Sequence, residues 1–510
     1  MALWRWLGKT ARELRVDGQA ELAEGLVRLA QMAADGQADA AAEAAPAVER
    51  TARSGSAPEW AAAFAGHWPV AARAGDQAEG ESVLPAALAR LRACHLAGGG
   101  TPEPGSGCGP AVCAAEPVLT CYTNIDGPGH VVDRATLLAE SLRHTLPGEP
   151  AWEALVLAQA DMLIDDERPD EAIRELDTRA AAARAGGAGV SLGYAFGYVR
   201  ALRHLDRYDE ALSALERVEA GMTAAWPGGA ARAAARRHTD TERARMLAWL
   251  ARAGRRSPQE ARAALPQLRE ADAHPRMRPA WAEAAEHLVA VGALDNDWRL
   301  GTALTTWSRY FERVGSHRLC LRVSLIAARL AAARGARWTA DCALRRAERA
   351  LERVRRGAEE AGDLAEIRAE AARRAPRGLP VAASEVLPLL RRQSPDEVDP
   401  EYQADLVLAA LEERPGDAAL LNALGQVGRT LGLTDAAAER HWPRVRSAPG
   451  DQKAALSLLE TLLADKDTAG LRALVRHLTD AALTPDDDPA PRHGTADAES
   501  PGIAATAPAG

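Results

Sequence analysis

Residues 414–451 have the sequence RPGDAALLNALGQVGRTLGLTDAAAERHWPRVRSAPGD. Pro-Gly-Asp occurs twice in this stretch, at residues 415–417 and again at residues 449–451. Proline lacks the amide donor that a helix interior needs, and glycine tolerates the backbone dihedrals of a helix end. Aspartate starts the next helix, because its carboxylate accepts unpaired amides of the first turn. The stretch therefore predicts a boundary at Pro415-Gly416, two helices, and a second boundary at Pro449-Gly450, thirty-four residues later.

Small and apolar residues occupy fixed places between these two boundaries, namely Leu421, Leu424, Gly425, Gly432 and Ala437. At this period and with these residues, the stretch resembles a tetratricopeptide (TPR) repeat, which is a pair of packed helices. Where the family prefers aromatic residues, this chain has Leu421, Gly428, Thr434 and His441. The repeat is degenerate, and we expect its packing to depend on aliphatic and backbone contacts.

Two further segments repeat one short phrase. They are Arg168-Pro-Asp-Glu-Ala-Ile-Arg-Glu-Leu176 and Arg207-Tyr-Asp-Glu-Ala-Leu-Ser-Ala-Leu215, thirty-nine residues apart. Each follows a polar turn and predicts the second helix of a hairpin, with Ala172 and Ala211 where two helices approach closely. The extra residues fall in a glycine-rich turn at residues 184–189. About a quarter of the chain carries this resemblance clearly.

The composition favours helices throughout the chain. Alanine, leucine, arginine and glutamate dominate the 510 residues, and aromatic residues make up only 4%. A sheet protein needs more β-branched and aromatic residues, and a chain of this length exceeds one compact core. In a stack of hairpins, each pair of helices buries its apolar face on its neighbours. We predict an all-α fold, and the TPR resemblance implies a right-handed α-solenoid of TPR-like helical hairpins with an open concave trough.

Changes in composition divide the chain into five parts. Residues 1–97 predict an N-terminal helical region that caps the array, with membrane-surface binding by its first residues as the alternative. Residues 98–110 are a Gly/Pro-rich linker, which cannot support a helix. Residues 111–375 predict a TPR-like helical array and residues 376–483 predict C-terminal TPR-like repeats. Large apolar side chains almost vanish in residues 484–510, which predicts a disordered tail.

Two charged segments predict solvated helices. Residues 345–374 alternate Arg and Glu at three- and four-residue steps, which favours one helix with ion pairs along its surface. A second run has Arg232, Arg236, Arg237, Arg243, Arg245, Arg252, Arg255 and Arg256. This run could contact nucleic acid or an acidic partner. The net charge of -9 makes nucleic-acid binding unlikely, and we interpret the run as a solvated helix face.

The signatures of common enzymes are missing. Gly8-Lys9-Thr10 lacks the upstream glycine of a phosphate-binding loop, and the Gly80–Leu84 segment lacks the closing glycine of a hydrolase elbow. No apolar run is long enough for a signal peptide or a membrane span. We therefore expect a cytoplasmic protein that is not an enzyme and has no cofactor. Catalytic groups need not form a local motif, so an enzyme on a helical scaffold stays open as an alternative.

The cysteines suggest one metal site. Cys94, Cys108, Cys113 and Cys121, with His130 nearby, surround the Gly-rich segment and could bind zinc. Their spacings differ from those of a zinc finger, and we interpret these residues, like Cys320 and Cys342, as buried thiols without a metal. A regulatory sensor, in which a ligand or metal near residues 108–130 changes the curvature of the array, stays open as an alternative function.

The TPR resemblance implies that the protein is a scaffold or adaptor that binds a protein or peptide partner in its concave groove. The groove-facing positions of the family correspond here to Phe196, Arg200, Arg203, His204, Asn422, Gln426 and Arg429. These side chains can hydrogen-bond an extended peptide or attract its carboxylates. One subtype of the family binds a C-terminal carboxylate through Lys and Asn, but Leu157 and Asp161 stand at those places here, so that ligand is not expected. The identity of the partner and the oligomeric state are left open.

Overall fold

The described part of the chain is entirely helical. The computed structural model describes residues 18–34, 38–55, 115–143, 145, 150–185, 192–225, 229–373, 382–392, 399–465 and 467–483, and isolated positions between 7 and 15 and between 64 and 89. No strand occurs among these residues, which confirms the all-α prediction. None of the described helices combines the length and low polarity needed to cross a membrane. The predicted linker at 98–110 and tail at 484–510 lie outside these ranges.

A helical pair stands at the N-terminus. Helices α2 (Ala20–Ala34) and α3 (Ala38–Ser54) pack against each other. They come close at Gly25, where an added Cβ would lie 3.1 Å from a methyl group of Val48. Their shared core contains five buried leucines, Leu7, Leu14, Leu22, Leu26 and Leu29. The described residues thus agree with the predicted N-terminal helical region.

The next helices form the two predicted hairpins and a pair before them. They are α6 (Ala115–Asp126), the short 3₁₀ helix η1 (Pro128–His130), α7 (Val131–Leu142), α8 (Pro150–Asp165), α9 (Pro169–Ala185), α10 (Leu192–His204) and α11 (Tyr208–Ala225). Helix α6 continues to Asp126, because Ile125 and Asp126 are each only 1% exposed and are held against other helices.

The repeated phrase has the same structure in both hairpins. Ala172 and Ala211 are fully buried where α9 and α11 meet their neighbours, as predicted. The residue before each phrase, Glu167 or Asp206, has a positive φ that ends the preceding helix in a left-handed turn. The first arginine of each phrase then pairs with the glutamate three residues later at 2.7 Å. Similar sequence therefore gives a similar turn at both places.

The middle of the chain continues as packed helices of uneven length. They are α12 (Gly229–Arg252), α13 (Pro258–Ala264), α14 (Leu268–Ala273), α15 (Arg278–Ala290), α16 (Trp298–Arg313), α17 (His317–Arg334), α18 (Arg337–Leu351) and α19 (Ala358–Arg373). The single solvated helix predicted over residues 345–374 is wrong, because the chain turns between α18 and α19. Arg346 in this segment is only 2% exposed and pairs with Glu312 and Asp435.

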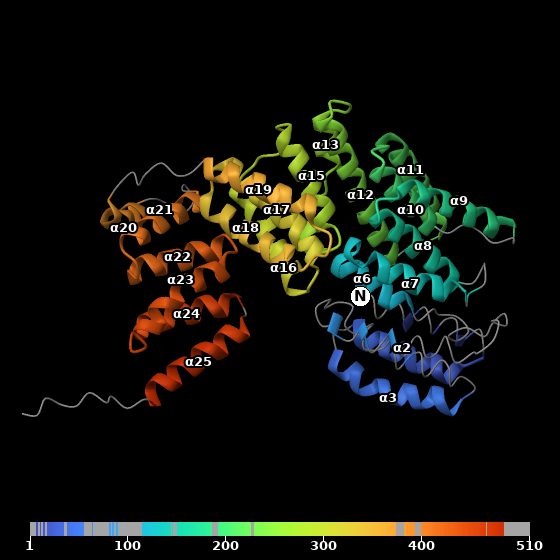
Figure 1. Cartoon of the computed structure of the whole chain (residues 1–510), viewed down its shortest axis with the longest axis horizontal. Coiled ribbons are helices and arrows are strands. Elements are labelled where there is room, and N and C mark those ends of the chain that lie inside the picture. Colours follow the sequence, from blue (N-terminus) through green and yellow to red (C-terminus); the bar gives the residue numbers. More distant parts are fainter. Residues whose placement is uncertain are drawn as a thin grey trace, which may run out of the picture.

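Six of these helices form a ring, which we define as α6, α8, α10, α12, α15 and α17 (Figure 1). Helix α6 packs against α17, although the two are far apart in the sequence. Asp126 of α6 lies 2.9 Å from Arg318 of α17 and accepts the backbone amide of Arg355 at 2.8 Å. The ion pair between Arg356 and Asp166 adds a second contact at 2.9 Å. The expected open trough is therefore closed in this part of the molecule.

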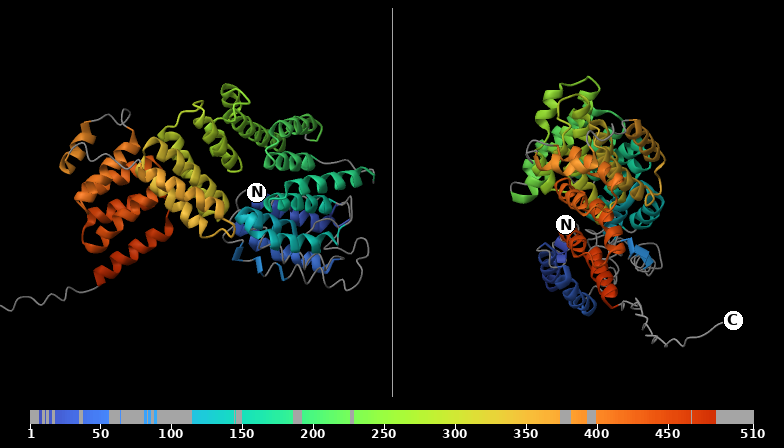
Figure 2. Two further views of the ribbon diagram at one scale, coloured as in Figure 1. Left: turned by 45° about the horizontal axis from the view of Figure 1, so that its top comes forward. Right: turned by 90° about the vertical axis from the view of Figure 1, so that its left-hand side faces the viewer.

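The C-terminal helices leave the ring as a separate stack (Figure 2). They are α20 (Ala383–Arg392), α21 (Pro400–Glu413), α22 (Ala418–Thr430), α23 (Thr434–Ser447), α24 (Gln452–Asp465) and α25 (Thr468–Leu483). Both predicted boundaries are confirmed as turns between helices. Asp417 accepts the amides of Ala419 and Leu420 at 2.9 and 3.2 Å, and Asp451 accepts that of Ala454 at 3.1 Å.

The repeat at 414–451 buries non-aromatic residues at the four positions where the TPR pattern prefers aromatic ones. Leu421, Gly428, Thr434 and His441 are all buried. A Cβ added at Gly428 would lie 3.0 Å from the Cβ of Ala437 and 3.3 Å from the ring of Trp338. The missing side chain thus lets α22 approach both α23 and α18. Close backbone approach replaces the bulk that an aromatic residue would supply.

Arginines join this stack to the helices around the ring. Arg334 of α17 forms two hydrogen bonds of 2.7 and 2.8 Å to Glu401, whose side chain is almost fully buried. Arg346 of α18 reaches Asp435 of α23 at 2.8 Å, and Arg309 donates to the carbonyl oxygen of Gly432 at 2.7 Å. Buried ion pairs of this kind fix one relative placement, because a separated partner would stay desolvated and unpaired.

Candidate functional site

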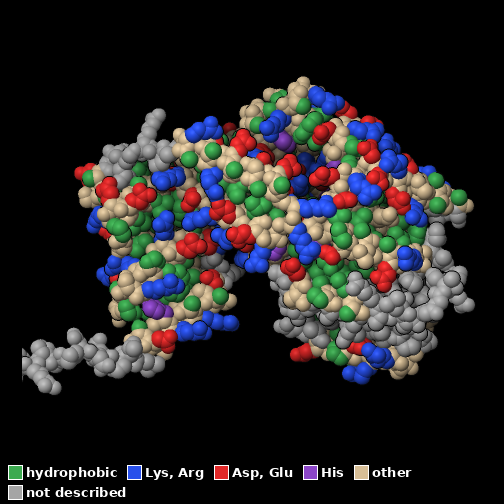
Figure 3. Space-filling view, in the orientation of Figure 1, with side chains coloured by type: hydrophobic (Ala, Val, Ile, Leu, Met, Phe, Trp, Pro, Cys, Tyr) green, Lys and Arg blue, Asp and Glu red, His purple; other side chains and the backbone are tan. Residues whose placement is uncertain are grey.

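The four predicted groove residues of α10 lie on the inner side of the ring. Phe196 packs against His238 of α12, with ring centroids 5.4 Å apart. Arg200 contacts α8, and Arg203 contacts α12. Figure 3 shows charged side chains gathered around a hollow at the centre of the ring.

Arg200 is already occupied by two carboxylates of the neighbouring helix. Its guanidinium lies 2.7 Å from Asp161 and 2.8 Å from Asp165. Asp165 is also paired with Arg134 of α7, which is almost fully buried. Asp161 stands at one of the two positions where the carboxylate-binding TPR subtype has Lys or Asn. An acidic residue there repels a ligand carboxylate and binds an internal arginine instead.

The same alternation of charge continues across α12 and α15. Arg203 lies 3.8 Å from Glu242, and Arg245 lies 3.1 Å from Glu283 and also contacts Glu242. Burial opposes ionisation of Glu242, but the guanidiniums of Arg245 and Arg203 outweigh it and lower its pKa to about 2. Nearby arginines lower the pKa of Glu283 as well, so Glu242 and Glu283 both stay charged at neutral pH. Their negative charges offset the positive charges of the arginines beside them.

His204 is a neutral member of this group. Part of its side chain is exposed to the hollow, yet the surrounding walls restrict the water around it. This desolvation, together with the positive charges of Arg203 and Arg200, lowers its pKa to about 3. At neutral pH His204 can exchange hydrogen bonds but cannot attract an anion by charge. Phe196, Arg200 and Arg203 thus contact neighbouring helices, whereas His204 contacts Arg203 of its own helix.

The second predicted set lies on α22 and does not join the first. Asn422, Gln426 and Arg429 are exposed, and their side chains have no hydrogen-bond or ion-pair partner in the structure as described. They follow each other at three- and four-residue steps and so share one helix face. Unlike Arg200 and Arg203, these groups are free to bind another molecule.

The repeat period identifies the matching face of the next hairpin. Adding thirty-four residues to Asn422, Gln426 and Arg429 gives Leu456, Glu460 and Leu463 of α24. Both leucines are 55% exposed, which is unusual for a large apolar side chain in these helices. Helix α24 packs beside α22. We define the C-terminal face as these six residues, Asn422, Gln426, Arg429, Leu456, Glu460 and Leu463.

The sequence could have revealed the two leucines, since the period was already visible at residues 414–451. The groove positions predicted from the TPR resemblance include residues of α22 but none of α24. Exposed leucines flanked by Glu460, Arg429 and two amide side chains form a mixed apolar and polar surface. Such surfaces bury apolar side chains of a ligand while hydrogen bonds fix its orientation.

The proposed metal candidates do not assemble in the described residues. Cys94, Cys108 and Cys113 lie outside them. Cys121 is buried in an apolar cluster, and its burial raises its pKa to about 12, which disfavours the thiolate that binds zinc. His130 bonds Asp133 at 2.9 Å and packs on Tyr122. Among the described residues no three potential ligands come together as a metal site, and Cys320 and Cys342 are buried as predicted.

The arginine run at 232–256 is only partly a solvated face. Arg243 reaches Glu219 of α11 at 2.5 Å, and Arg245 belongs to the network inside the ring. Arg255 and Arg256 are exposed and both lie near Asp209. Four of the eight arginines, Arg243, Arg245, Arg255 and Arg256, are therefore paired with carboxylates. The interpretation as a purely solvated face is wrong for Arg245, which is buried and connects α12 to α15.

Comparison with known proteins adds no relative. No protein-family model matches the chain, and no curated protein matches it significantly.

Proposed function

We propose that this protein is a non-enzymatic scaffold or adaptor, built as a right-handed TPR-like solenoid, which binds a peptide segment of a partner protein. The C-terminal face is the proposed binding surface. One observation carries the proposal. Equivalent positions of two successive hairpins present six exposed side chains, and the polar ones have no internal partner among the described residues.

The chemistry of this face suggests what the peptide contains. Leu456 and Leu463 lie about two helical turns apart on one face of α24, so each can bury a separate apolar side chain of the ligand. Arg429 can pair with a ligand carboxylate, and Asn422 and Gln426 can each donate and accept hydrogen bonds to a peptide backbone. A peptide with two apolar residues and one acidic residue fits these groups.

The ring is the weaker candidate for the same role. Arg200 and Arg245 are already paired with carboxylates of neighbouring helices, and Arg203 lies 3.8 Å from Glu242. A ligand would have to displace these internal pairs and would leave carboxylates unpaired, which costs free energy. This argument favours the C-terminal face over the α10 positions that the sequence also suggested.

Selection of peptides from a random 16-residue phage library on the purified full chain tests this proposal. Selected peptides are then measured by fluorescence polarisation against Arg429→Glu and against Leu456→Glu combined with Leu463→Glu. We expect at least tenfold weaker binding to each variant. Arg476→Glu and Val475→Glu on α25, which change exposed residues outside the C-terminal face, serve as matched controls and should bind normally. Failure to select any peptide, or equal binding by all variants, would refute the proposal.

A further inference from the structure

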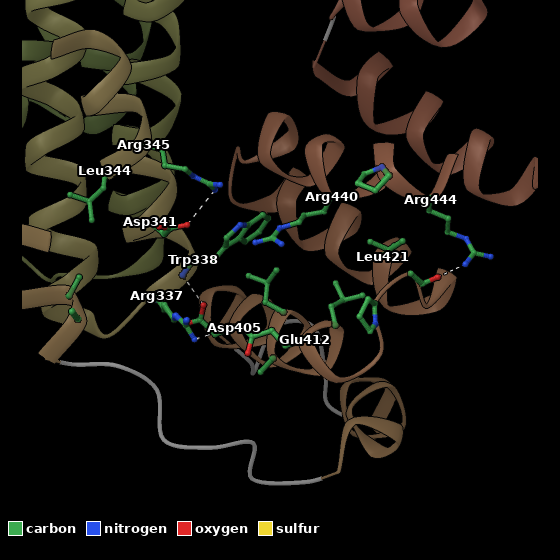
Figure 4. A pocket seen from close by; sticks show the side chains of 18 of the residues that line it. Arg337, Trp338, Asp341, Leu344, Arg345, Asp405, Glu412, Leu421, Arg440 and Arg444 are labelled. Carbon is green, nitrogen blue, oxygen red and sulfur yellow. Dashed lines mark hydrogen bonds and ion pairs between the residues drawn. The ribbon is translucent and has the colours of Figure 1, made fainter. Parts of the chain in front are cut away.

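A second surface lies between the ring-side helices and the C-terminal stack. A cavity of about 1180 Å³ opens between α18 and α19 on one side and α21, α22 and α23 on the other (Figure 4). We call it the inter-helix cavity. Its residues are distinct from those of the C-terminal face. Pockets for small molecules measure roughly 300 to 1,000 Å³, so this space is large for a single small ligand and suits a peptide segment.

The walls of the inter-helix cavity are helix faces with apolar centres. Leu344 comes from α18, Leu408 from α21 and Leu421 from α22, while Trp338 and Pro443 extend the apolar wall at α18 and α23. The lining residues of α18 recur at three- and four-residue steps, as do those of α21 and α23. Each helix thus turns one continuous face toward the same space. Three facing helices around an open slot are the setting in which an amphipathic helix binds.

Every carboxylate on these walls already has a partner. Asp405 accepts the amides of Trp338 and Arg337 at 2.8 and 2.9 Å, at the start of α18. Asp341 lies 3.4 Å from Arg345. The remaining two carboxylates pair in the same way, Glu412 with Arg337 at 4.0 Å and Glu348 with Arg368.

The arginines of the walls are not all matched. Arg444 forms an ion pair with Asp451 at 2.5 Å and donates a hydrogen bond to the carbonyl oxygen of Gly416. Arg440 has no hydrogen-bond or ion-pair partner in the described structure, and its side chain is exposed. In Figure 4 it extends from α23 toward the α18 side of the cavity. The walls therefore carry one arginine without an ion-pair partner beside an apolar surface.

We propose that the inter-helix cavity binds an amphipathic acidic helix of a partner protein, which places apolar side chains on Leu408 and Pro443, neither of which is buried, and a carboxylate on Arg440. Charge complementarity selects this ligand, since a carboxylate is the one group that completes the pairing of the wall. A basic helix would add unpaired positive charge, and an uncharged one would leave Arg440 unmatched. This site is independent of the proposed C-terminal face.

The probe is a fluorescein-labelled 18-residue designed peptide, with leucine at positions i, i+3, i+4 and i+7 and glutamate beside the leucine face. Two copies carry glutamine or lysine in place of the glutamates. With the full chain, we expect the glutamate peptide to bind at least tenfold more tightly than the glutamine peptide, and the lysine peptide to bind most weakly. Arg440→Glu should reverse this order, because it inverts the charge of the wall.

Two further variants keep the result interpretable. Ala409→Trp fills the space between the walls and should abolish binding while the thermal unfolding temperature is retained. Arg429→Glu changes the C-terminal face and should leave binding unchanged, which separates this proposal from the proposed function. The proposal is overturned if the glutamate peptide fails to bind at 1 mM, if it binds Arg440→Glu as well as the unchanged protein, or if only Arg429→Glu weakens it.

Discussion

The ring and the C-terminal stack place similar residues in opposite situations. On α10, Arg200 and Arg203 lie at predicted groove positions and are paired with carboxylates of the neighbouring helices. On α22, Arg429 lies at the equivalent kind of position and is exposed without a partner among the described residues. Arginines at predicted groove positions are thus paired with neighbouring helices in the ring and exposed to a possible ligand in the C-terminal stack.

Ring closure accounts for this difference. Helix α6 meets α17, so the inward-facing charges of α8, α10, α12 and α15 approach one another around a small hollow (Figures 1 and 3). Close approach under restricted hydration makes pairing obligatory, because an unpaired buried charge is costly. The polar side chains that α22 and α24 contribute to the C-terminal face are exposed, and they stay available. Groove position alone therefore does not identify a binding residue.

The largest effect is expected from opening the ring. Asp126→Ala removes a carboxylate that is 1% exposed and leaves the Arg318 guanidinium with fewer partners in a buried setting. We expect a loss of about 3 to 5 kcal/mol in the free energy of unfolding, measured by urea denaturation. Asp166→Ala, which removes a more exposed pair with Arg356, should cost about 0 to 1 kcal/mol. A loss of less than about 1 kcal/mol in Asp126→Ala would mean that the contact between α6 and α17 contributes little.

A smaller effect is expected from forcing apart the helices of the C-terminal stack. Gly428→Leu places a side chain where an added Cβ already lies 3.0 Å from Ala437. Overpacking of this kind costs about 1 to 3 kcal/mol, which thermal unfolding should show as a lower transition temperature. Gly450→Ala is the control, since no atom lies within 4 Å of its added Cβ. A stable Gly428→Leu protein would contradict the close packing of α22 on α23 and α18.

The comparison of paired and free arginines can be tested directly. Arg200→Ala leaves Asp161 unpaired inside the ring, and we expect it to cost about 1 to 2 kcal/mol of stability. Arg429→Ala removes no internal contact and should stay within about 0.5 kcal/mol of the unchanged protein. Chemical denaturation of both variants measures the two values. The contrast between the regions is lost if Arg429→Ala is the more destabilising change.

A separate effect concerns pH at the junction between the two regions. Burial raises the pKa of Asp405 to about 6, although two backbone amides of α18 favour its charged form. A carboxyl group whose pKa is higher in the folded protein than in the unfolded one stabilises the fold fully below the unfolded pKa, near 3.9. This stabilisation is lost as the pH rises through the folded pKa of about 6. Between pH 4 and 7, the unchanged protein should therefore lose stability relative to Asp405→Asn. Parallel stability curves for the two proteins would contradict the shift.

Local features of the fold could be predicted well from the sequence. The boundaries at 414–417 and 448–451 and the hairpins around Ala172 and Ala211 depend on turn residues and on small residues at fixed spacing, which act within one repeat. Those signals do not depend on the rest of the chain. The exposed leucines of α24 also follow from the period, once it is extended by one repeat.

Long-range charge pairing could not be predicted in this way. Asp126 and Arg318 are separated by 192 positions, and neither has a local pattern that marks a buried partner. For the same reason Arg346 was predicted to be solvated within a charged segment, whereas it connects Glu312 and Asp435 inside the structure. The sequence period of a helix tells which face a residue occupies, but not which other helix meets that face.

Hydrogen–deuterium exchange with a peptide selected on the full chain tests the central claim most directly, namely that the ring is a closed support and the C-terminal face the binding surface. The account predicts that the peptide slows exchange in residues 418–430 and 452–465 and leaves residues 150–165 and 192–204 unchanged. Slower exchange confined to residues 192–204 would place the ligand inside the ring and contradict the account.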